Sequence, residues 1–314
     1  MKKILIAIVV LLLAGVAGTG LWHTPERMLA LKDAMDRSRA GLTEYSLDTE
    51  SGQVRYLAGG KPDGPPLLLL HGFGTGKEQW APAARFLTGH FRLVIPDLPG
   101  FGESDRVQTG GYGMVVQGNR MAALMTALEF ERFHVAGSSM GGHIAGAMTI
   151  HHPERILSLG LFNPGGIKEP RRSEAKRIFD ETGVSPLVVQ NEEDYNRLLA
   201  FLFVQPPWVP ESVGRFMARR ALANRAFNTE LMEDSKDGMW PLDEHLEEIG
   251  VETFVLWGDQ DRVTDISALD VIREKLPGSR VTILKDCGHV PMLEQPAEAA
   301  GSYLTFLQDV ENRL

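Results

Sequence analysis

The fold of this chain follows from one short stretch, Gly137-Ser138-Ser139-Met140-Gly141. Residues 132–136 before it are typical of a strand, and residues 142–148 after it are typical of a helix. A serine on a sharp strand-to-helix turn is held in a strained backbone conformation, with its hydroxyl projecting from the sheet. We therefore predict that Ser139 is a nucleophile. The flanking glycines are needed because a Cβ at either position would collide with the neighbouring strand or helix.

Uninterrupted apolar runs predict further strands, and helical patterns fall between them. The runs cover residues 66–70, 91–96, 156–162, 252–257 and 280–284, and helical patterns cover residues 119–128 and 265–276. Residues 45–58, around Ser51-Gly52, favour an antiparallel hairpin at a sheet edge. Strands that alternate with helices predict an α/β fold with a mainly parallel, doubly wound sheet. Chemistry is then expected at the carboxyl ends of the strands.

Residues 168–250 interrupt this alternation, because they are helix-like and contain no run typical of a buried strand. We interpret them as a helical cap inserted into a core formed by residues 45–167 and 251–314. The apolar stretch at residues 198–210 could close the site and line an apolar channel. The alternative is a helical bundle that only packs against the core.

A serine hydroxyl is a weak nucleophile until a base takes its proton. In hydrolases with such an elbow, the chain order is serine, then an acid, then histidine. Asp261 and His289 follow two of the predicted strands in this order, and we predict them as acid and base. Asp259 competes for the acid position, but it is better interpreted as bracing its turn through hydrogen bonds to the backbone.

A tetrahedral intermediate needs N–H donors for its oxyanion. We predict the backbone N–H of Met140, at the start of the helix, and that of Phe73, in the loop after residues 66–70. His71 is expected to shape this loop rather than act as a second base. The residues expected to line the substrate site are His71, Gly72, Phe73 and Ser138.

The N-terminus predicts a membrane anchor at residues 1–23. Lys2 and Lys3 precede an uncharged, almost entirely apolar run at residues 4–22, which is long enough to cross a bilayer. A cleavable signal peptide is the alternative. An uncleaved anchor would keep the lysines in the cytoplasm and place the catalytic domain on the other side. Residues 24–44 predict an amphipathic juxtamembrane helix that lies on the membrane, packs on its own domain or supports a homodimer.

Charge and composition exclude several other functions. The formal net charge of −9 argues against a nucleic-acid partner, because phosphate binding requires a basic face. Cys287 is the single cysteine, which excludes an internal disulfide. The sequence has neither metal-ligand spacing nor a glycine-rich phosphate loop, so we predict no cofactor and no metal.

Residues 45–314 resemble the α/β-hydrolase family. The motifs that carry this resemblance are His71-Gly72-Phe73-Gly74, residues 97–104, Gly137-Ser138-Ser139-Met140-Gly141, Gly258-Asp259-Gln260-Asp261 and Gly288-His289-Val290-Pro291. With the N-terminal apolar run, the chain is similar to membrane-anchored bacterial lipases, PlaF-type phospholipases A and ABHD6-like monoacylglycerol lipases. This resemblance implies a serine ester hydrolase that releases fatty acids from glycerophospholipids or acylglycerols through an acyl-enzyme. It also implies a bacterial-type inner membrane, with the catalytic domain on the periplasmic side.

Other functions fit the same fold, because the α/β-hydrolase fold hosts many chemistries. The alternatives are an esterase for small esters, a C–C hydrolase, a peptidase, or a catalytically silent lipid sensor.

Overall fold

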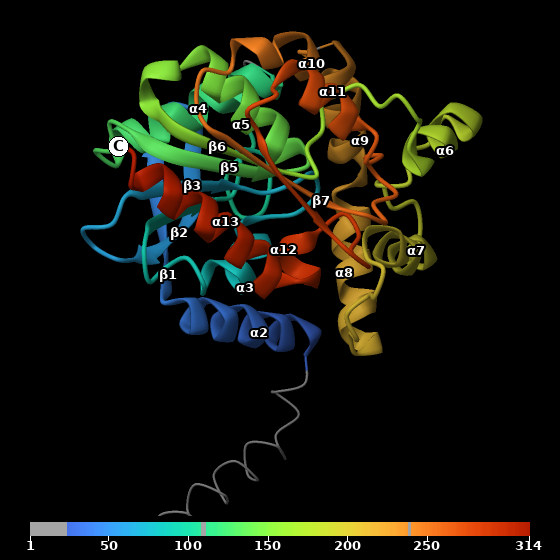
Figure 1. The fold of residues 1–314 in the computed structure, drawn as a ribbon. Coiled ribbons are helices and arrows are strands. Elements are labelled where there is room, and N and C mark those ends of the chain that lie inside the picture. Colours follow the sequence, from blue (N-terminus) through green and yellow to red (C-terminus); the bar gives the residue numbers. More distant parts are fainter. Residues whose placement is uncertain (1–23, 108–110, 238–239) are drawn as a thin grey trace, which may run out of the picture.

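The computed structural model describes residues 24–107, 111–237 and 240–314 (Figure 1). The predicted anchor at residues 1–23 lies outside the described residues. Within the described ranges, no helix combines the length and apolar character that a membrane span requires.

The core is an eight-stranded sheet with the order β1-β2-β4-β3-β5-β6-β7-β8. The hairpin β1–β2 forms an antiparallel edge, and β3 to β8 are parallel to one another. Both the mainly parallel sheet and the edge hairpin are therefore confirmed. The strands are β1 Leu42–Thr49, β2 Gly52–Gly60, β3 Pro66–Leu70, β4 Arg92–Pro96, β5 Phe133–Ser138, β6 Ile156–Phe162, β7 Thr253–Gly258 and β8 Arg280–Leu284.

Helices cover both faces of the sheet (Figure 1). Leu68 and Leu70 of β3 belong to the core on one face, whereas Leu67 and Leu69 belong to the core on the other. Successive strand side chains point to opposite faces, which explains why this strand reads as an unbroken apolar run. The first face is covered by α4 Met114–Ala127, α5 Met140–His151, α10 Leu242–His245 and α11 Ala268–Lys275; the second by α3 Ala81–Ala84, α12 Pro291–Glu294 and α13 Pro296–Glu311.

The segment between β6 and β7 consists of helices and loops and contains no strand among its described residues. Four of its helices lie beside the sheet: α6 Glu174–Thr182, α7 Glu192–Leu202, α8 Glu211–Ala223 and α9 Arg225–Asp237 (Figure 1). In the last part of the predicted cap, Leu242 of α10 and Leu246 of the 3-10 helix Leu246–Glu248 are fully buried in the same core as α5. These apolar side chains pack on the sheet domain, and the bounds of the cap at residues 168–250 stay a prediction.

The helix α2, Pro25–Ala40, is shorter than the segment predicted at residues 24–44. It ends at Gly41, which has φ 63°, and Leu42 begins β1. The helix packs near α3 and α8. On its inner side Arg37 forms ion pairs with Glu44 and Glu78, which fix the helix to the sheet domain.

Candidate active site

The turn between β5 and α5 has the strained geometry that its sequence predicts. Ser139 has φ 55° and ψ −117°, in the left-handed region that side chains rarely adopt. A Cβ on Gly137 would lie 2.0 Å from Gly141 O, and one on Gly141 would lie 2.4 Å from Leu70 O. Because these obstacles are backbone atoms, neither glycine can be replaced without moving a strand or the helix.

The predicted acid and base meet at the carboxyl edge of the sheet. His289 Nδ1 lies 2.8 Å from Asp261 Oδ2, and both side chains are buried. Asp261 lies in the loop after β7, and His289 in the loop after β8. With the Nδ1 proton donated to this carboxylate, Nε2 is the ring nitrogen that can accept a proton, as a general base requires.

The carboxylate of Asp261 accepts hydrogen bonds from several further groups. Asn163 Nδ2 lies 2.5 Å from Oδ2 and Thr264 Oγ1 lies 2.7 Å from it, while the backbone N–H of Val263 donates to Oδ1 at 2.8 Å. Burial alone would raise the pKa of Asp261, but the charge of His289 and the hydrogen bonds from His289, Asn163 and Thr264 outweigh it and lower the pKa. Asp261 is therefore ionised and held in one orientation.

Asn163 and Thr264 are functional candidates that the sequence analysis missed. Asn163 stands directly after β6 with φ 45°, a conformation that asparagine tolerates better than most residues. The turn after Asn163 also touches the elbow, because the N–H of Ser139 donates to Phe162 O at 2.9 Å and that of Gly165 to Ser139 O at 3.0 Å. Residues 162–165 therefore support both Ser139 and Asp261. The signal in the sequence that could have identified Asn163 was its position: it is a turn residue at the end of β6, the strand that pairs with the elbow strand β5.

The segments that carry the two predicted oxyanion donors both lie close to Ser139. Met140 begins α5, and a Cβ on Gly72 would lie 3.4 Å from Ser139 Cβ, so the loop of Phe73 passes close to the nucleophile. The N–H of Gly72 is occupied, since it donates to Gln79 Oε1 at 2.8 Å. None of the hydrogen bonds found in the described residues uses the backbone N–H of Phe73 or Met140.

Two of the residues expected to line the substrate site have buried side chains. His71 is fully buried; its Nε2 accepts from Leu98 N at 2.9 Å and its Nδ1 donates to Gly72 O at 2.8 Å. Burial lowers the pKa of His71, so the ring is neutral and shapes the loop. Ser138 is fully buried as well, with Oγ 3.5 Å from Gln79 Nε2. Both side chains are therefore buried in the walls of the site, and their contact with a substrate stays a prediction.

Other polar groups near the site have structural roles. Asp259 Oδ1 accepts from Cys287 N at 3.3 Å and so links the acid loop to the base loop. Desolvation raises the pKa of Cys287 to about 12, which excludes its buried thiol as a nucleophile at neutral pH. His143, on α5, is occupied by the carbonyl of Trp240 at 2.6 Å.

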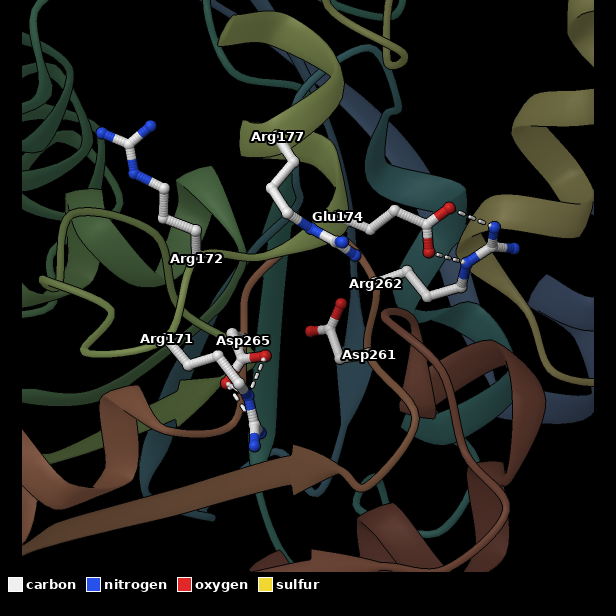
Figure 2. A pocket seen from close by; sticks show the side chains of 7 residues that line it. All are labelled: Arg171, Arg172, Glu174, Arg177, Asp261, Arg262 and Asp265. Atoms are coloured by element: carbon white, nitrogen blue, oxygen red, sulfur yellow. Dashed lines mark hydrogen bonds and ion pairs between the residues drawn. The ribbon is translucent and has the colours of Figure 1, made fainter. Parts of the chain in front are cut away.

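An open cavity of about 440 Å³ adjoins Asp261, where the cap meets the core (Figure 2). Arg262 forms two hydrogen bonds of 2.7 Å with Glu174, and Arg171 pairs with Asp265. The lining is charged and contains none of the apolar residues 198–210, so the apolar channel stays a prediction. The lining residues are Arg171, Arg172, Glu174, Arg177, Asp261, Arg262 and Asp265.

The sheet order, the elbow and the acid–base pair define the α/β-hydrolase class. Residues 67–301 match the α/β-hydrolase family, and the chain belongs to this family. It is 33% identical over 277 residues to Lipase 3 of Moraxella sp. (strain TA144), covering 86% of each chain. It is 28% identical over 312 residues to the monoacylglycerol lipase ABHD6 of Mus musculus, covering 96% of this chain and 92% of the relative.

Similar solved structures include the crystal structure of a membrane phospholipase A, described as a novel bacterial virulence factor. The TM-score is 0.89 at 42% sequence identity, covering 99% of this chain and 100% of that chain. The family and these relatives identify the chain as an ester hydrolase.

Proposed function

We propose that the protein is a membrane-anchored serine carboxylic-ester hydrolase of the lipase or phospholipase A type, which releases fatty acids from glycerophospholipids or acylglycerols. The observation that carries the chemistry is the bond from His289 Nδ1 to the buried Asp261, at the same sheet edge as the strained Ser139. The lipid substrate is supported by the similarity to a lipase, a monoacylglycerol lipase and a membrane phospholipase A.

The proposed reaction has two halves. Ser139 Oγ attacks the ester carbonyl carbon while His289 Nε2 takes the hydroxyl proton, and the imidazolium is stabilised by Asp261. The imidazolium then gives this proton to the leaving alcohol, which departs and leaves the acyl group on Ser139. Water attacks the acyl-enzyme with His289 again acting as base, so that a fatty acid leaves and the serine is restored.

The negative charge on the tetrahedral intermediate is stabilised from the opposite side. The N–H groups of Phe73 and Met140 are the proposed donors, and the N-terminus of α5 adds the positive end of its dipole. Loss of one donor of this kind typically costs 100- to 1000-fold in rate in related chemistry, roughly 3–4 kcal/mol.

The proposed location is the bacterial inner membrane. It is supported by the two lysines and the apolar run at residues 4–22, which favour a single span with the catalytic domain on the periplasmic side. α2 begins at Pro25, directly after this run, and a homodimer through these N-terminal segments belongs to the same proposal. Resistance of the full chain to alkaline extraction from membranes, lost when residues 1–23 are deleted, is the expected result.

Fatty-acid release from defined lipids tests the substrate class. The full-length protein in detergent is given phosphatidylethanolamine, phosphatidylglycerol and monoacylglycerol, and released fatty acid is measured by mass spectrometry against Ser139→Ala. Release well above that control is expected. Turnover of only short p-nitrophenyl esters, a dienoate with a scissile C–C bond or a peptide would assign a different specificity. Absence of any turnover would favour a silent lipid sensor.

A further inference from the structure

One short segment of the cap, residues 200–205 at the end of α7, is bonded directly to the loop of the catalytic base. The backbone N–H of His289 donates to Leu202 O at 2.8 Å. Glu294 Oε1 accepts from the N–H groups of Val204 and Gln205, each at 2.8 Å, and its Oε2 accepts from Gly288 N at 2.7 Å. A single carboxylate therefore joins the cap to the residue that precedes His289.

The cap segment and the loop of His289 are in close contact as well as joined by hydrogen bonds. A Cβ on Gly288 would lie 2.4 Å from Leu202 O, so only glycine allows this contact. Phe203 is buried in the same hydrophobic core as Val290 and Met292, which flank Pro291 at the start of α12. The cap segment is thus packed into the surroundings of the base rather than resting on them.

The same cap segment is also bonded to the loop of the catalytic acid. Arg262 directly follows Asp261, and its Nη1 donates to Ala200 O at 3.0 Å. The rest of its guanidinium is held by Glu174 at the start of α6 and lies 4.7 Å from the ring centroid of Phe201 (Figure 2). Residues 200–205 therefore touch both loops on which the acid and base are carried.

We propose that Glu294 and Arg262 are positioning residues. They couple the packing of cap residues 200–205 against the core to the alignment of Asp261 with His289, so that both are formed or lost together. A carboxylate that accepts hydrogen bonds from three backbone N–H groups is held in one orientation, and its removal leaves all three donors unpaired. When the cap segment detaches, the support of the base loop is lost together with that of the acid loop. The inference rests on the proposed function, because it assigns a role in the reaction of Ser139.

The test uses the full-length enzyme and four variants: Glu294→Gln, Arg262→Lys, the pair combined, and Glu298→Gln as a control. Glu298 is an exposed glutamate one turn further along the chain, in α13. We measure kcat and KM on a p-nitrophenyl ester over a range of pH, and the rate at which a fluorophosphonate labels Ser139. Each experiment runs at a temperature where circular dichroism shows the variant folded.

Glu294→Gln and Arg262→Lys are each expected to lower kcat about tenfold with a smaller effect on KM, and to slow labelling similarly, because base alignment is lost rather than binding. In the double variant, kcat should fall by less than the product of the two single-variant factors. Both substitutions disrupt the same set of contacts between the cap segment and the two loops. The acidic limb of the pH profile should move in both variants and stay unchanged in Glu298→Gln.

Two outcomes would overturn the inference. One is folded variants whose kcat and labelling rate stay within twofold of wild type, whatever happens to their melting temperature. The other is fully multiplicative losses in the double variant, which would make the two residues independent. If Glu294→Gln does not fold, Arg262→Lys with its labelling rate and pH profile decides the question alone. Wild-type enzyme that neither turns over ester nor is labelled would instead overturn the proposed function.

Discussion

The elbow at Ser139 and the Asp261–His289 pair are held by different kinds of force. The elbow is fixed by backbone sterics within a few residues, because Gly137 and Gly141 leave no room for a Cβ. The acid is fixed by hydrogen bonds from residues far apart in the chain, among them Asn163. Substitutions at the elbow should therefore cause large losses of activity or stability. Substitutions around Asp261 and His289 should cause smaller, graded losses.

Removal of the nucleophile gives the largest expected effect. Ser139→Ala should lower kcat for ester hydrolysis by about 10⁴-fold or more, because no other group can form the acyl-enzyme. The folded state should be almost unchanged, since the substitution removes one hydroxyl. Initial rates on a p-nitrophenyl ester and thermal unfolding check the two parts. Retention of more than a few per cent of activity would move the chemistry away from Ser139.

Addition of one carbon beside the elbow should be the next largest effect. Gly137→Ala places a Cβ 2.0 Å from Gly141 O, and we expect destabilisation of about 3 kcal/mol or more. Gly214→Ala is the matched control, because this position in α8 has no atom within 4 Å of the added carbon. The control should be neutral or slightly stabilising, as for other glycines inside helices. Similar urea midpoints for the two variants would refute the steric account of the elbow.

Loss of one donor to the acid should have a graded effect. Asn163→Gly removes the amide that reaches Asp261 and still tolerates φ 45°. We expect kcat to fall about tenfold with little change in KM, because the remaining donors keep Asp261 ionised. Thr264→Ser, which retains its hydroxyl, should stay near wild type. A loss as large as that of Ser139→Ala would remove the contrast between the two sides.

The pH dependence of stability should show the smallest effect. The pKa of Asp261 is lowered in the folded state, so the carboxylate stabilises the fold above the unfolded pKa of about 3.9, and this contribution is lost as pH falls through the folded value. The melting temperature of wild type should therefore exceed that of Asp261→Asn near neutral pH, and the gap should narrow below pH of about 4. A difference in melting temperature that grows as the pH falls would contradict this prediction.

The contrast also explains what the sequence could predict. The elbow, the leucine strand and the order of Ser139, Asp261 and His289 are local patterns or follow from chain order, and the fold came from them. Asn163 was missed because it becomes a neighbour of Asp261 only through the sheet order β5-β6-β7, which places β6 between the elbow and the acid. Gln79 was missed for a similar reason, since its contact with Ser138 joins segments far apart in sequence.

The direction of side chains was the other feature that the sequence could not predict. His71 and Ser138 stand next to site residues in the chain, so both were expected to meet a substrate. In the folded chain both side chains are fully buried, one at the end of β5 and one in the loop after β3. Adjacency in sequence therefore predicts the right loop but not the right face.

The central claim is that Ser139 is a nucleophile activated by His289 and Asp261. The most direct test is intact-mass analysis with peptide mapping after incubation with a fluorophosphonate. We predict a single adduct located on Ser139, which is absent in Ser139→Ala and forms far more slowly in Asp261→Asn. An adduct on another residue, or a folded wild-type protein that is never labelled, would contradict the claim.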